Sequence, residues 1–220
     1  MTLPLKQPVT HRAVHRDFIY LASQSPRRRQ LLEQIGVPHQ LLLPGADEDA
    51  EALESARHGE LPAVYCERVT LAKLAAARQR LIQRRLPDAP ILCSDTTVAL
   101  GRRILGKPRD AADACVTLRL LSGQTHRVIT TVAVAAGRRT LRAVSVSRVR
   151  FAELPESVVQ AYVATGEPFG KAGAYAIQSS LAGWIAHIDG SYSGIMGLPL
   201  YETAELLRKA GIPSLTCKTS

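Results

Sequence analysis

Short apolar runs alternate with amphipathic segments along the chain, and this alternation predicts most of its elements. The runs at 18–22, 40–43 and 91–94 are typical of buried strands, because apolar residues follow one another with little interruption. Apolar side chains spaced three and four residues apart predict helices over 26–35 and over about 62–85. Strands and helices therefore alternate through the first half of the chain.

The second half predicts a hairpin followed by shorter elements. Two long β runs, 125–135 and 140–151, are joined by a glycine-containing turn, as expected of a meander at the edge of a sheet. Asp110 caps a predicted helix that ends at Leu121. The same signals predict the remaining segments: a helix over 154–162, a loop over 166–175, strands at 176–178 and 184–188, a loop over 191–197 and a helix over 198–210.

The composition is that of a soluble globular protein of one domain or two closely packed lobes. Its 220 residues are 46% hydrophobic and 21% charged, and they are long enough to bury a substantial core. Residues 1–17 lack the apolar stretch of a secretory signal, and no run has the length of a membrane span. We expect a cytoplasmic protein with a loosely ordered N-terminal arm over 1–17 and one domain over 18–220.

The net charge indicates the kind of partner, and the cysteine spacing indicates the state of the thiols. The formal net charge of +9 favours an acidic partner, which could be nucleic acid, an anionic membrane or a phosphorylated small molecule. The four cysteines are far apart and form no C-x-x-C pair, so neither a zinc site nor a disulfide framework is indicated. Free thiols in a reducing compartment are the expected state.

The turn after the first strand is the strongest candidate for binding an anion. Ser25 is placed as an N-cap and Pro26 as the first helical residue, and three arginines follow at once. A helix N-terminus disfavours cations, so three arginines at this place are unusual. A bound phosphate would explain their presence. A capped surface helix with solvated arginines is the alternative at this point.

A second candidate is Asp95, a charged residue that follows the apolar run 91–94. A buried carboxylate needs a cation or a metal as partner. Lys107 stands between Gly106 and Pro108 in a constrained loop, and an acidic cluster occupies 47–51. Walker, G-x-G-x-x-G and G-x-S-x-G sequences are absent, and the histidines lack metal-ligand spacing. Carboxylates together with lysines and arginines favour metal-assisted phosphoryl chemistry, with nucleotide hydrolysis as the natural candidate.

Eight motifs in order resemble those of one known family. They are SQSPRR at 23–28, DE at 47–48, Lys73 in the following helix, SDT at 94–96, ILGKP at 104–108, LSGQTH at 121–126, GEPFGKAGAYAIQ at 166–178 and GSYSGIMGLPLYET at 190–203. Over about 19–207 the chain resembles the Maf-type nucleoside triphosphate pyrophosphatases.

The resemblance implies a fold, an activity and a cofactor. The fold is α/β, with an elongated mixed β-sheet flanked by helices and two lobes around a central cleft, similar to the inosine triphosphate pyrophosphatases. The activity is hydrolysis of nucleoside triphosphates to the monophosphate and pyrophosphate, which cleans the nucleotide pool and requires a divalent cation, Mg²⁺ or Mn²⁺. A homodimer is also implied.

Site residues follow from the same motif positions. Asp95 is the implied catalytic base and lies near the metal, which Glu48 helps to bind. The residues implied to bind the triphosphate or to line its pocket are Ser23, Ser25, Arg28, Lys73, Lys107 and Lys171. Three positions, Arg27, Thr96 and Gln178, match the branch that acts on dTTP and UTP, and modified pyrimidine nucleotides are further expected substrates.

Two departures and two alternatives remain. The family commonly has alanine where this chain has Ser94, and 194–196 differs from the usual loop sequence. One alternative activity is 7-methyl-GTP pyrophosphatase. The other is a non-enzymatic regulator of cell division that binds nucleotides or nucleic acid. We do not expect nucleic acid to be a partner, because the basic residues are dispersed and aromatic residues are few.

Overall fold

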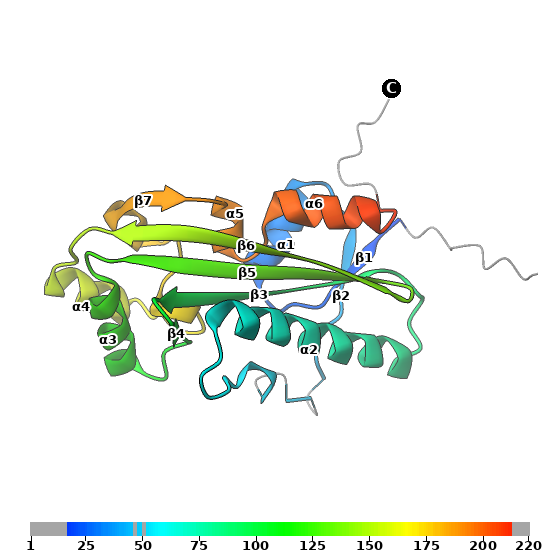
Figure 1. Ribbon diagram of the computed structural model, residues 1–220, viewed down its shortest axis with the longest axis horizontal. Coiled ribbons are helices and arrows are strands. Elements are labelled where there is room, and N and C mark those ends of the chain that lie inside the picture. Colours follow the sequence, from blue (N-terminus) through cyan, green and yellow to red (C-terminus); the bar gives the residue numbers. More distant parts are fainter. Residues whose placement is uncertain (1–16, 46–47, 50–51, 213–220) are drawn as a thin grey trace, which may run out of the picture.

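One mixed sheet of seven strands organises the molecule (Figure 1). The computed structural model describes residues 17–45, 48–49 and 52–212, so residues 1–16 of the predicted arm over 1–17 and Asp47 lie outside the described residues. The strands are β1 (Ile19–Leu21), β2 (His39–Leu41), β3 (Ile91–Leu100), β4 (Arg103–Leu105), β5 (Thr125–Ala136), β6 (Arg139–Phe151) and β7 (Ile185–Asp189). Their order is β2-β1-β3-β5-β6-β7, with β4 beside β3. The pairs of β1 with β2 and β3 are parallel and the others antiparallel, which confirms the expected mixed sheet.

Helices cover both faces of this sheet (Figure 1). The α-helices are α1 (Pro26–Gln34), α2 (Pro62–Gln83), α3 (Ala111–Leu121), α4 (Glu156–Ala164), α5 (Tyr192–Met196) and α6 (Leu200–Lys209), and the 3₁₀ segments are η1 (Ala52–Glu54), η2 (Ala172–Ala174) and η3 (Ser180–Trp184). Helix α2 packs on one face, α1 and α6 pack on the other, and α3 and α4 pack together at one end of the sheet. The expected α/β fold is confirmed.

Strand β3 is the common element of the core, because it contributes to each of three hydrophobic clusters. Val98 packs with α3 and α4, Leu92 packs with α1 and α6, and Ile91 packs with α2. Of the four cysteines, Cys66, Cys93 and Cys115 are buried and free, as expected, and Cys217 lies outside the described residues.

The sheet is split along one edge of β3. Strand β1 pairs with β3 at Ile91 and Leu92, and β4 pairs with it from Val98 to Leu100. Within the described chain, residues 93–97 therefore have a neighbouring strand on one side alone, which is β5. The side chains and backbone of this stretch can be reached from the gap between β1 and β4.

Local signals predicted several element boundaries correctly. Helix α2 begins at Pro62, and the Asp110 carboxylate accepts a hydrogen bond from the backbone N–H of Asp113 as the cap of α3. Ser25 is the N-cap residue of α1, but its hydroxyl makes no capping hydrogen bond. The Ser25 hydroxyl therefore does not serve to cap α1.

Two predictions near the C-terminus were wrong. Residues 176–178 form a turn rather than a strand, because the N–H of Ser179 bonds back to the Ala176 carbonyl. The predicted loop over 191–197 contains α5, which Ser191 caps by accepting a hydrogen bond from Gly194 N–H. Gly197, with a φ of 118°, then ends α5, and the last helix begins at Leu200 rather than Leu198.

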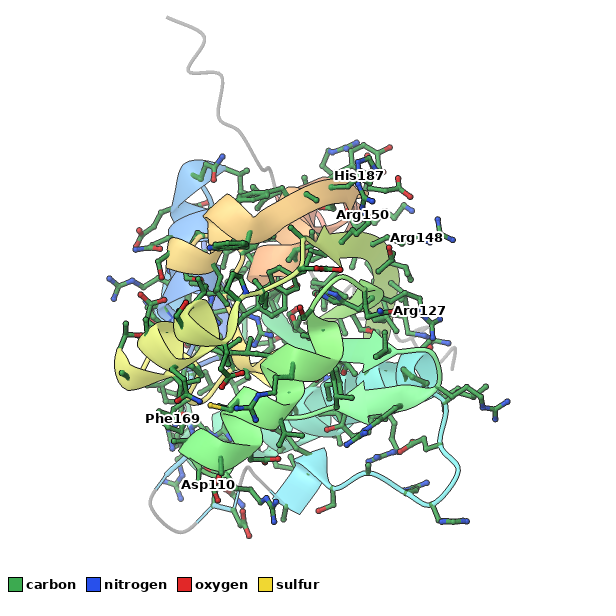
Figure 2. All side chains as sticks on the ribbon, turned by 90° about the vertical axis from the view of Figure 1, so that its left-hand side faces the viewer. Asp110, Arg127, Arg148, Arg150, Phe169 and His187 are labelled. Atoms are coloured by element: carbon green, nitrogen blue, oxygen red, sulfur yellow. The ribbon has the colours of Figure 1, made fainter. Side chains whose placement is uncertain are left out.

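Part of the positive charge lies on an open part of the sheet. Arg127 of β5 is opposite Arg148 of β6, and Arg150 of β6 is opposite His187 of β7. These side chains lie on one side of the molecule in Figure 2, and Arg148 pairs with Asp189 at 3.2 Å. None of the four belongs to the cavity described below.

Candidate active site

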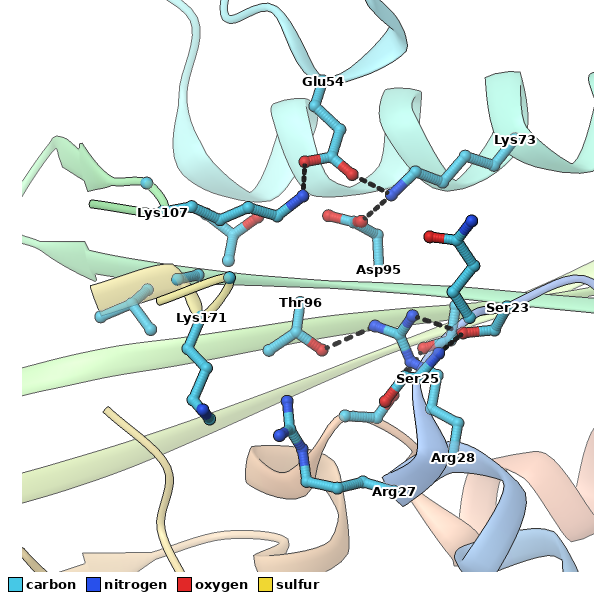
Figure 3. A pocket seen from close by; sticks show the side chains of 18 of the residues that line it. Ser23, Ser25, Arg27, Arg28, Glu54, Lys73, Asp95, Thr96, Lys107 and Lys171 are labelled. Carbon is cyan, nitrogen blue, oxygen red and sulfur yellow. Dashed lines mark hydrogen bonds and ion pairs between the residues drawn. The ribbon is translucent and has the colours of Figure 1, made fainter. Parts of the chain in front are cut away.

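A cavity of about 1060 Å³ opens at the gap in the sheet. Its walls come from the β1–α1 turn, η1, α2, the middle of β3, the loop after β4, the segment before η2 and the end of α5. The predicted site residues that line it are Ser23, Ser25, Arg27, Arg28, Glu48, Lys73, Asp95, Thr96, Lys107 and Lys171. Segments distant in sequence therefore meet here, as Figure 3 shows for most of these side chains.

The strand geometry of β3 divides the cavity into two parts. Successive side chains of a strand point to opposite faces, so Asp95 and Thr96 project in opposite directions (Figure 3). Asp95 points toward α2 and meets Lys73, whereas Thr96 points toward α1 and meets Arg28. Both side chains reach the cavity because this stretch borders the gap in the sheet.

The Asp95 part is a chain of alternating charges. Lys73 Nζ lies 2.6 Å from Asp95 Oδ1 and 2.7 Å from Glu54 Oε1, and Lys107 Nζ lies 2.7 Å from Glu54 Oε2. The Asp95 side chain is 11% exposed, so it is a nearly buried carboxylate with an ammonium partner. The sequence pattern does not predict Glu54, because a glutamate beyond an acidic loop gives no signal of its long-range partners.

Charge pairing and burial act in opposite directions on these groups. Burial alone would lower the pKa of Lys73, but the charges of Asp95 and Glu54 and their hydrogen bonds outweigh it, so the pKa is raised. Burial alone would raise the pKa of Glu54, but Lys73 and Lys107 outweigh it, so the pKa is lowered. Lys73 and Glu54 are thus held in their charged forms.

Glu48 lines the cavity, but its carboxylate is already engaged. Arg80 Nε lies 2.8 Å from Glu48 Oε1, and Arg80 Nη2 lies 2.6 Å from Glu48 Oε2. These hydrogen bonds, together with one from the Gly45 N–H, lower the pKa of Glu48 to about 2. Arg80 is itself buried and donates to the Leu42 carbonyl at 2.8 Å. Both oxygens of Glu48 thus accept hydrogen bonds from one guanidinium, and its role as a metal ligand stays a prediction.

Arg28 joins three segments in the other part of the cavity. Its guanidinium donates to the Gly197 carbonyl at 2.8 Å, to Ser23 Oγ at 3.2 Å and to Thr96 Oγ1 at 3.3 Å. Burial lowers its pKa, with the charge of Asp95 acting in the opposite direction. Arg28 thus holds the β1–α1 turn, β3 and the end of α5 together at the wall of the cavity.

Two positions predicted to set specificity, Arg27 and Thr96, are linked to α5. Arg27 Nε donates to the Met196 carbonyl at 3.4 Å. Thr96 Oγ1 lies 3.0 Å from Thr130 Oγ1, which donates to the Gly194 carbonyl at 2.7 Å. The departures from the family pattern meet at the same place, since Ser94 Oγ donates to the Gly197 carbonyl at 2.9 Å. A hydroxyl on β3 thus anchors the residue that follows the altered loop.

Gln178 is not brought into the cavity. It lies in the turn after η2, its side chain is exposed, and it is not among the residues that line the cavity. The expectation that it stands at the end of a strand is wrong, because the segment bends back at Ser179. Lys171, by contrast, lies at the wall near Arg27, whose charge together with burial lowers the pKa of Lys171.

Comparison with known proteins agrees with the sequence motifs and the fold. The family model described as Maf-like protein matches residues 18–210. A protein of Polaromonas sp. named dTTP/UTP pyrophosphatase is 62% identical over 196 residues, which are 89% of this chain and 97% of the relative. Relatives of the same name are 60% identical over 195 residues in Albidiferax ferrireducens, covering 89% and 98%, and 57% identical over 204 residues in Burkholderia pseudomallei, covering 92% and 98%. The chain therefore belongs to the Maf family.

Proposed function

We propose that this chain hydrolyses dTTP and UTP to the nucleoside monophosphate and pyrophosphate, and that it clears modified pyrimidine triphosphates from the nucleotide pool. The observation that carries the proposal is the position of the Asp95 carboxylate. It extends from the interior strand β3 and lies beside Lys73 in a cavity lined by further cations. Relatives at 57% to 62% identity bear the name of this activity, which supports the same substrates here.

Asp95 is the proposed general base. It accepts a proton from a water molecule that attacks the α-phosphorus, and the bond to the bridging oxygen breaks so that pyrophosphate leaves. Lys73 fixes the position of the carboxylate through its 2.6 Å contact. Lys73, Lys107 and Lys171 offer positive charge to the phosphates, and Ser23 and Ser25 border the same pocket.

The divalent cation implied by the family, Mg²⁺ or Mn²⁺, suits part of this site. Asp95 offers a hard oxygen ligand, and such ions commonly take their other ligands from substrate phosphates and water. The described residues contain no group of three or more His, Cys, Asp or Glu side chains placed to hold a metal, and Glu48 is engaged by Arg80. We propose that Asp95 and the substrate phosphates hold the ion, with Glu48 as a further predicted ligand. When bound, it would neutralise charge on the phosphate oxygens.

Base selection is assigned to the part of the cavity around Thr96 and Arg27. Both side chains contact α5 or residues bonded to it, so this short helix shapes the end of the cavity that they border. Gln178 remains a predicted specificity residue, and its side chain would have to turn toward the cavity to act on the base.

A nucleotide panel tests the substrate assignment. Purified protein with Mg²⁺ should release pyrophosphate from dTTP, UTP and a C5-modified UTP much faster than from 7-methyl-GTP or dATP. Release from 7-methyl-GTP without release from dTTP or UTP would contradict the substrate and keep the reaction class. Absence of release from every nucleotide would remove the enzymatic proposal.

The proposal extends to compartment and assembly. None of the helices in the described part of the chain is both long and apolar enough to cross a membrane. We propose that the enzyme works in the cytoplasm, where nucleoside triphosphates are made and used. A homodimer, implied by the family resemblance, remains a prediction.

A further inference from the structure

Glu54 contacts both lysines that line the Asp95 part of the cavity. Its Oε1 atom lies 2.7 Å from Lys73 Nζ, and its Oε2 atom lies 2.7 Å from Lys107 Nζ (Figure 3). The two lysines come from α2 and from the loop after β4, so one carboxylate bridges opposite walls of the cavity. This bridge lies where the proposed function places the substrate phosphates.

The segment that carries Glu54 is anchored to α2. The Tyr65 hydroxyl donates to the backbone carbonyl of Glu54 at 2.7 Å, and Arg68 Nη2 donates to the Ser55 carbonyl at 2.9 Å. Arg68 is itself held by Glu60 through two hydrogen bonds of 2.7 and 2.8 Å. The fold therefore delivers the Glu54 carboxylate to the lysines through built contacts on both sides of the residue.

Partial burial strengthens these ion pairs relative to pairs on an open surface. The side chains of Glu54 and Lys73 are 25% and 20% exposed, so water screens their charges less than it would at full exposure. Lys73 has three N–H donors, and two of them are taken by Glu54 and Asp95. A phosphate that approaches Lys73 meets a cation whose charge is already shared between two carboxylates.

The charge balance of the cluster gives Glu54 its role. Glu54 and Asp95 carry two negative charges, and Lys73 and Lys107 carry two positive charges, so the four groups are neutral together. A polyphosphate adds several negative charges, and it gains full attraction from the lysines only when Glu54 withdraws. We propose that Glu54 competes with substrate phosphate for Lys73 and Lys107 and thereby sets the affinity of the site for the triphosphate. This inference rests on the proposed assignment of both lysines to the phosphates.

Binding of pyrophosphate to the full-length protein tests the inference without turnover. Calorimetric titrations in metal-free buffer compare the wild type with Glu54→Gln and with Glu156→Gln, whose carboxylate pairs with Arg119 outside the cavity. Glu54→Gln should bind pyrophosphate about three to ten times more tightly, because the ion pairs with the partly buried Lys73 and the exposed Lys107 no longer oppose binding. Glu156→Gln should bind it like the wild type.

Unchanged or weaker binding by Glu54→Gln, in protein whose thermal melting shows an intact fold, would overturn the inference. Weaker binding would mean that Glu54 holds the lysines ready for phosphate rather than competing with it. As a kinetic readout, Glu54→Gln should lower KM for dTTP by a similar factor. A wild type that hydrolyses no nucleotide would refute the proposed function, whereas the pyrophosphate titration would still decide the role of Glu54.

Discussion

Lys73 is held between Asp95 and Glu54, and this position decides what each group can do. The raised pKa of Lys73 keeps it an ammonium, so it cannot accept the proton of an attacking water. Glu54 has a lowered pKa and bonds two lysines, which also makes it a poor proton acceptor. Asp95 is the carboxylate that combines a place on the buried strand with a single ammonium contact to Lys73.

Replacing Asp95 by asparagine tests this assignment. Asp95→Asn keeps the shape of the side chain but removes the charge that accepts the proton, so kcat for dTTP should fall at least about 100-fold. The KM should change far less, because the lysines remain. Steady-state kinetics on Asp95→Asn and on Asp189→Asn, an exposed carboxylate paired with Arg148 outside the cavity, measures the effect. Near-normal kcat in Asp95→Asn would refute the role.

Residue type and motif position predicted which side chains gather at the cavity, but not how they pair. Glu48 is predicted to lie beside a metal, and in the structure it bonds Arg80, a buried residue of α2 that also donates to the Leu42 carbonyl. Glu54 was missed for the same reason, since its partners Lys73 and Lys107 are distant in sequence. Ion pairs of this kind depend on tertiary geometry that spacing along one chain does not encode.

At the scale of elements, η2 packs closely against β3 and fixes this part of the cavity wall. Gly173 has a φ of 72°, and its N–H bonds to the Gly106 carbonyl at 3.1 Å. A methyl group added at Gly173 would lie 2.8 Å from Val98 Cγ1. Glycine is needed here for the left-handed backbone and also for the close approach, and the contact places Lys107 and Lys171 on neighbouring segments.

Two glycine substitutions separate these requirements. Gly170 has a φ of 71° but no atom within 4 Å of an added Cβ, so Gly170→Ala should lower the free energy of unfolding by about 1 kcal/mol from backbone strain alone. Gly173→Ala should lose about 1 to 3 kcal/mol more through overlap with Val98. Urea denaturation measures both values, and equal losses in the two variants would show that the Val98 contact is unimportant.

Elements with strong local signals were predicted well, and those defined by short caps were not. The apolar run before Asp95 and the periodicity of α2 follow directly from burial. The pattern at 176–178 predicts a strand, but the structure has a turn there. Ser179 then caps η3 by accepting a hydrogen bond from Leu181 N–H. A short capped helix competes with a loop by only a few hydrogen bonds, so the sequence pattern does not separate them.

At the scale of the whole molecule, a buried aromatic cluster ties the hairpin to the η2 segment. His126 Nε2 lies 2.7 Å from the Tyr175 hydroxyl, and the ring of Phe151 stacks on His126 with centroids 5.5 Å apart. His126 and Tyr175 belong to two of the motifs that carry the family resemblance, and the structure brings them into contact. Burial lowers the pKa of His126 to about 4.

This histidine should make stability fall in mild acid. The unfolded chain binds a proton at His126 below its ordinary pKa of 6.5, whereas the folded protein does so only near 4, so protonation favours unfolding between these values. Between pH 7.5 and pH 5 the free energy of unfolding should drop by about 2 kcal/mol more in the wild type than in His126→Gln. Urea titrations at both pH values measure this, and equal drops would contradict a buried neutral His126.

The split in the sheet has a mechanical consequence. Because β3 contributes to all three hydrophobic clusters, a hinge motion between the two ends of the molecule would disturb the packing of that strand. The floor of the cavity is accordingly stiff, and any closure over a nucleotide has to come from the rim, where Glu54 and Lys171 are carried by short segments outside the sheet. Affinity for the phosphates can then change through these rim segments while the packing of β3 stays the same.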